Sequence, residues 1–98
     1  MGFRRAKRQV LECLSSGKIL HEVRQHIDLK NLFSTGQISL DEISLIIARA
    51  KGTDYQQAKH HTVKSVNVHI LKTRYCGQRW YIKWYYIEPN SVFISVHH

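Results

Sequence analysis

Near the C-terminal end of the 98-residue sequence, side chains that can exchange protons or bind anions alternate with apolar ones. Successive side chains of a β-strand point to opposite faces of the sheet, so each set should occupy one face. The apolar set is Trp80, Ile82, Trp84 and Tyr86, and the second set is Tyr81, Lys83 and Tyr85. We therefore expect one apolar face and one face equipped for chemistry.

The same alternation extends both faces to the neighbouring predicted strands. We expect the apolar face to pack against the helices. Its further members should be Val66, Val68, Ile70, Val92, Ile94 and Val96. The opposite face should then collect, beside the second set, Asn67, His69, Leu71, Phe93, Ser95 and His97. This assignment places two imidazoles, phenols and an ammonium group together.

Such a face could cleave RNA without a metal ion. Cleavage through the RNA's own 2′-hydroxyl requires a base, an acid for the leaving 5′ oxygen, and cations beside the phosphate. His97 or His69 could transfer the protons because imidazole titrates near neutral pH. Tyr81 could act as an acid or hydrogen-bond donor, and Lys83 could stabilise the charge. These four are the candidate catalytic residues, with the choice of acid and base left open.

The chain is strongly and unevenly basic. Fifteen Lys and Arg against seven Asp and Glu give a net charge of +8, and no acidic residue occurs between Asp54 and Glu88. Basic residues interleaved with aromatic ones are typical of a surface that binds a polyanion, although an acidic protein would also suit it. The candidate RNA-binding residues are Lys59, Lys72, Arg74, Arg79 and Tyr85.

The same stretch argues against a cofactor. Its lack of carboxylates disfavours a metal-dependent mechanism, and the histidines match no compact set of metal ligands. We therefore expect no metal and no other cofactor. Two distant cysteines predict no disulfide framework and favour a reduced, cytoplasmic chain, and no apolar run approaches the roughly 18 residues of a membrane span.

Helical patterns precede the alternating segments. Apolar residues at helical spacing predict a helix over about 3–16. Ser39 and Glu42 form a capping box that starts a second helix. Weaker signals suggest that Asp28 caps a short helix over 29–33 and that Thr53 and Asp54 cap one more turn before residue 60.

Three alternating segments follow, joined by short turns. We therefore expect a single α+β domain, residues 1–98, with N-terminal helices at about 3–60 packed on a C-terminal three-stranded antiparallel sheet at about 63–97.

Several segments resemble the MqsR-like mRNA-cleaving toxins of bacterial type II toxin–antitoxin systems, which belong with the RelE-type toxins. QVLECLSSGKI is similar to their first helix and the strand entry after it, SLIIARAKGTDYQQ to their second helix and the residues after it, and GQRWYIK with VFISVHH to their hairpin and last strand. The resemblance implies a RelE-like fold, endoribonuclease activity on mRNA and a cognate antitoxin protein as partner.

The resemblance also assigns residues. The family's strand tyrosine falls on Tyr81, its late-strand lysine on His97, its first-strand glutamine near His69, and its basic residue loosely near Lys59. Two of these positions differ in type, so this chain would use histidine where the relatives use lysine and glutamine.

Two other classes of function stay open. A non-catalytic nucleic-acid-binding module would use Tyr81, Tyr85 and Phe93 to stack bases, with lysines on the phosphates. A small inhibitor would instead block a nucleic-acid enzyme by occlusion or mimicry. Truncation of His97 or Tyr81 distinguishes the binding module from a ribonuclease. Only a ribonuclease would lose RNA cleavage while keeping its affinity for RNA.

Overall fold

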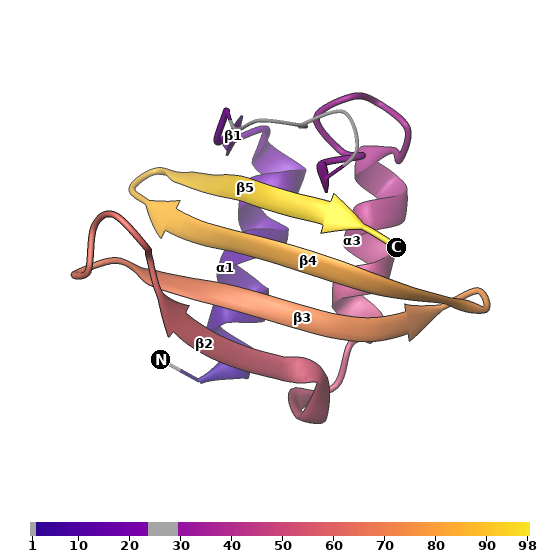
Figure 1. Ribbon diagram of the computed structural model, residues 1–98. Helices are drawn as coiled ribbons and strands as arrows, with labels where there is room; N and C mark the ends of the chain where they lie inside the picture. The colour runs from indigo at the N-terminus through magenta and orange to yellow at the C-terminus, as the bar shows by residue number, and fades with distance from the viewer. Residues whose placement is uncertain (1, 24–29) are drawn as a thin grey trace.

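The computed structural model describes residues 2–23 and 30–98. Figure 1 shows one curved sheet with long helices packed on one of its faces. The strands lie in the order β1-β5-β4-β3-β2. β1 runs parallel to β5, and the other neighbours are antiparallel. In chain order the elements are α1 (Phe3–Ser16), β1 (Ile19–His21), α3 (Leu40–Arg49), the 3₁₀ turn η1 (Gly52–Asp54), β2 (Tyr55–Lys59), β3 (Asn67–Tyr75), β4 (Gln78–Ile87) and β5 (Asn90–His97).

The expected three-stranded antiparallel, RelE-like sheet is wrong. The three predicted strands form its centre as β3, β4 and β5, but β1 and β2 extend it at both edges into a five-stranded mixed sheet. The segment after Asp54, predicted to be a helical turn, is β2. Asp54 does accept the Lys51 N–H at 2.9 Å, but the turn ends at once. β1 and β2 have only three and five residues, too few for a clear alternation.

The two strong helix predictions are confirmed. α1 buries Ala6, Val10, Cys13 and Leu14 and ends at Gly17, whose φ of 73° is in the left-handed region. Such a backbone favours glycine because it has no Cβ. At the start of α3 the Ser39 hydroxyl accepts the Glu42 N–H at 3.1 Å.

Of the predicted short helix over 29–33, the described part begins at Lys30, which is helical, but the helix does not continue to residue 33. Its cap, Asp28, lies outside the described residues. Asn31 forms an isolated bridge to Val96, and a turn follows it. The Asn31 side chain is fully buried, where it contacts the His21 imidazole at 3.0 Å and accepts the Ser34 N–H at 3.0 Å.

The faces of β4 are as expected, but those of β3 are inverted. Cys76 and Gly77, with φ of 52° and 79°, form a two-residue turn that pairs Tyr75 with Gln78. Directly paired residues share a face, so odd-numbered β3 residues join even-numbered β4 residues. His69 and Leu71 consequently face the helices with Trp84 and Ile82, while Val68 and Ile70 face the other way.

Because of a β-bulge, one part of β5 has the predicted faces and the other part has the opposite ones. Lys83 pairs with Ser95 but Trp84 pairs with Phe93, which leaves Ile94 as the extra residue. Val96, Ser95 and His97 have the expected faces. Phe93 instead joins the helix-side core, and Val92 and Ile94 change to the opposite face, called the open face below.

Candidate nucleic-acid interface

The open face brings His97, Tyr81 and Lys72 into one row across three strands. His97 is paired with Tyr81 on β4, and Tyr81 is paired with Lys72 on β3. The His97 and Tyr81 rings stack, with centroids 5.1 Å apart and planes inclined by 20°. Lys83 lies two residues further along β4, opposite Ser95. Three of the four candidate catalytic residues, Tyr81, Lys83 and His97, therefore share this face.

The surroundings of His97 favour the neutral form of its imidazole at pH 7. Burial lowers the pKa of the imidazole below its ordinary value of 6.5, and the electrostatic effects of the nearby Lys30 and His98 lower it further. A neutral imidazole carries a proton on only one of its two ring nitrogens, so the other nitrogen can accept a proton. The His97 ring is therefore suited to act as a general base.

His69 does not belong to this group, which corrects its predicted place beside Tyr81 and His97. It lies on the helix side, 3% exposed. Its Nδ1 is 2.6 Å from the Tyr55 hydroxyl, and its ring packs at 5.4 Å on that of Trp84. Burial lowers its pKa to about 4. It is a core histidine whose hydrogen bond is made within the protein.

Protein stability should therefore depend on pH through His69. The unfolded chain takes up the proton near pH 6.5 but the folded chain only near pH 4. The free energy of unfolding is therefore unaffected by the titration of His69 above about pH 6.5. It falls as the pH decreases from about 6.5 to about 4, by at most roughly 3 kcal/mol. Urea unfolding of the wild type and of His69→Phe, which does not titrate, at several pH values measures this. Parallel loss of stability in both proteins would exclude His69 as the cause.

The predicted RNA-binding residues divide between two places. Lys72, Arg74 and Arg79 line a shallow cleft of about 370 Å³ at one end of the sheet, together with residues near the end of α3 and in η1. Lys59 is outside this cleft, at the opposite end of β2, where it pairs with Asn67. Tyr85 is on the open face, toward the same end as Lys59.

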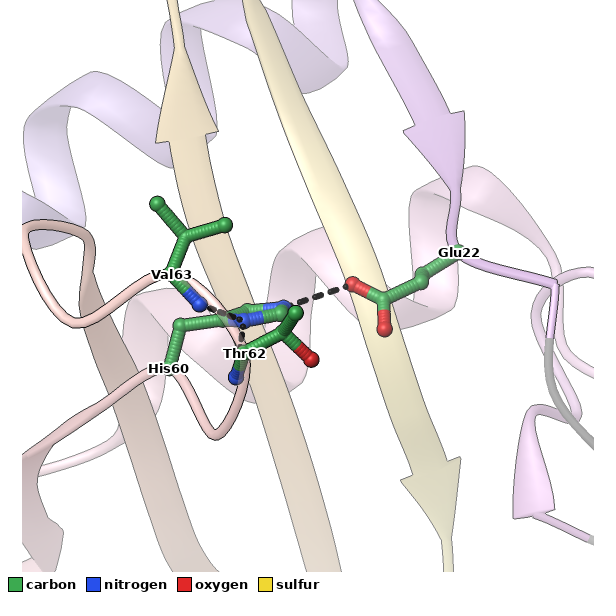
Figure 2. Close-up of polar contacts among 4 residues, drawn as sticks. All are labelled: Glu22, His60, Thr62 and Val63. Atoms are coloured by element: carbon green, nitrogen blue, oxygen red, sulfur yellow. Dashed lines mark hydrogen bonds and ion pairs between the residues drawn. The ribbon is translucent and has the colours of Figure 1, made fainter.

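The chain after β2 covers that end of the open face (Figure 2). His60 is only 8% exposed, and its ring meets the Tyr85 ring edge-on, with centroids 5.1 Å apart. Its Nδ1 accepts the N–H groups of Thr62 and Val63 at 3.1 and 3.2 Å. The proton therefore sits on Nε2, which donates to Glu22 at 3.1 Å.

This His60–Glu22 contact was missed by sequence reasoning. Its two residues are 38 positions apart, and neither stands in a motif. Because all the ring nitrogens of His60 are engaged with protein groups, we interpret it as a structural clamp. The contact fixes the loop over one end of the open face and leaves Tyr81 and His97 at the other end.

The described residues contain no group of three or more His, Cys, Asp or Glu side chains that could hold a metal ion. Within the same residues, no helix is both long and apolar enough to cross a membrane. Cys13 is buried and Cys76 is exposed, and both are free thiols.

No protein-family model matches this sequence, and a search of curated proteins finds no match either. The resemblance to MqsR-like toxins therefore stays a prediction from short segments.

Proposed function

We propose that this protein is a metal-independent endoribonuclease that cleaves mRNA on the open face of its sheet. The observation that carries the proposal is the stacking of His97 on Tyr81, in one row with Lys72 and beside Lys83. These residues provide a neutral imidazole, a phenol and two ammonium groups on one surface. They are the groups required for cleavage through the 2′-hydroxyl.

In this mechanism His97 removes the proton from the 2′-hydroxyl. The 2′ oxygen then attacks the adjacent phosphorus, and the bond from phosphorus to the 5′ oxygen breaks. Tyr81 donates its proton to that leaving oxygen. Lys83 and Lys72 stabilise the charge that develops on the phosphoryl oxygens. The products are a 2′,3′-cyclic phosphate and a free 5′-hydroxyl, which balances atoms and protons.

The biological setting of the proposal rests on the resemblance alone. As in toxin–antitoxin pairs, a cognate antitoxin protein would neutralise the enzyme in the cytoplasm. The strongly basic chain suits an acidic partner as well as it suits RNA.

Incubation with end-labelled RNA in excess EDTA tests the activity. We expect cleavage that persists in EDTA and produces 2′,3′-cyclic phosphate ends. A matched RNA with 2′-O-methyl groups should stay intact, because it lacks the nucleophile. Cleavage of the methylated RNA, or loss of cleavage in EDTA, would contradict the mechanism.

A second candidate is a non-catalytic RNA-binding module. Tyr81 and Tyr85 pack against a small apolar cluster of Val68, Ile70 and Ile94 on the open face. Both tyrosines are half-buried and not enclosed in the core, as a base-stacking role requires. Salt-dependent binding of RNA without any cleavage would favour this function.

A further inference from the structure

We infer that the cleft beside the β3–β4 turn, called the basic cleft below, is a binding site for the phosphates of an RNA strand. The inference rests on the proposed function for the identity of its ligand, but it concerns a site distinct from the His97–Tyr81 pair. The cleft is lined by Arg49, Lys51, Asp54, Lys72, Thr73, Arg74 and Arg79.

The cations of the basic cleft come from separate segments that the fold brings together. Arg49 ends α3, and Lys51 directly precedes η1. The other three project from β3 and β4. In Figure 1, η1, the β3–β4 turn and the end of β5 lie at the same end of the molecule. The pairing of β2 with β3 stops at Leu71, so the remaining residues of β3 border the cleft instead of a strand from β2.

Within residues 2–23 and 30–98, the charge of the basic cleft is largely unneutralised. Its one carboxylate, on Asp54, accepts the Lys51 backbone N–H at 2.9 Å and the Thr73 hydroxyl at 3.0 Å. Among the described residues none of the five cations forms an ion pair. The Arg49 guanidinium lies 5.7 Å from the centre of the Tyr75 ring. Five cations therefore face one carboxylate that is already hydrogen-bonded.

Arg74 and Arg79 give the strongest sign of a ligand. They are paired directly across β3 and β4 on the same face. Like charges in this position destabilise a sheet. An anion bound between them would remove the repulsion, and two guanidinium groups match the geometry of phosphate oxygens.

The position of the cleft favours RNA over an acidic protein segment. Lys72 belongs both to the cleft and to the row with Tyr81 and His97. Adjacent strands are about 4.8 Å apart, so His97 is about 10 Å from Lys72 along the row. An RNA strand held by its phosphates in the cleft would thus lead directly to the proposed base.

The salt dependence of binding tests this inference. The probe is a fluorescent 2′-O-methyl RNA of about twelve nucleotides, which is not cleaved. The affinity falls as salt is added, and each lost phosphate contact reduces the steepness of the plot of log affinity against log salt by about 0.7. We expect Arg49→Ala/Lys51→Ala to lower the slope by about 1.4 and the affinity at about 50 mM salt by more than about tenfold. The Lys51 side chain is exposed, so Lys51→Ala should not disturb the fold. This single variant should reduce the steepness by about 0.7.

The control is Arg8→Ala/Lys18→Ala, which removes the same charge from outside the cleft. An equal change of slope in both double variants would overturn the inference, because it would show only a general effect of charge. An unchanged slope in Arg49→Ala/Lys51→Ala would also overturn it, as would tight binding of poly-glutamate without binding of the RNA. RNA cleavage by wild type and variants is measured separately, so an intact enzyme with an irrelevant cleft is distinguishable from a protein without ribonuclease activity.

Discussion

Replacing His97 with alanine is expected to lower the rate of RNA cleavage by about 10²–10⁴-fold, the usual contribution of a general base. The ring is neutral at pH 7 and stacks on Tyr81, so its loss removes the proton acceptor without removing a core residue. Single-turnover cleavage of labelled RNA measures the rate. Affinity for the uncleavable RNA should change little.

His98→Ala is the matched control for this experiment. His98 is exposed and meets the edge of Trp80, with ring centroids 4.8 Å apart, so its removal should leave the rate nearly unchanged. A fall in rate with both variants would show that the chain end, and not the His97 imidazole, is required. Tyr81→Phe keeps the stacked ring but removes the hydroxyl, and should also reduce cleavage.

The pH profile of wild-type cleavage gives a readout specific to a base. Because the pKa of His97 is lowered, the rate should fall on the acid side with a midpoint below about 6.5. Below that midpoint His97 is protonated and cannot accept the 2′-hydroxyl proton. This acid limb should disappear from the residual activity of His97→Ala. Its persistence in that variant would assign the titration to another group.

Trp84→Ala is expected to destabilise the fold by about 3–5 kcal/mol. Trp84 is fully buried at the centre of the sheet, where its ring packs on those of His69 and Phe93 at 5.4 and 6.2 Å. Truncation would leave a cavity under the helices that rigid neighbours cannot fill. Urea unfolding monitored by circular dichroism measures the change.

Two variants control this prediction. Trp84→Phe keeps most of the apolar surface and removes the indole Nε1, which has no hydrogen-bond partner among the described residues, so it should cost much less than alanine. Lys83→Ala changes the next residue on the open face and should have little effect. Greater destabilisation by Lys83→Ala than by Trp84→Ala would invert the assigned faces of β4.

The sequence alone determined the elements whose signals are local. Helical spacing gave α1, the Ser39 capping box gave the start of α3, and alternation gave β3, β4 and β5 with the correct faces for β4. It also placed His97 and Tyr81 on one face. The alternation along β4 and along the last residues of β5 was enough to place these two residues together. The last residues of β5 lie beyond the bulge, so the bulge does not change their faces.

The tertiary structure decided everything that depends on how separate segments pair. The two-residue turn at Cys76 and Gly77 set the register that moved His69 into the core, and the bulge at Ile94 reversed part of β5. The edge strands β1 and β2 are too short to show a period and exist through their pairing with β5 and β3. The basic cleft likewise has no sequence motif, since its cations lie on four separate segments that only the fold brings together.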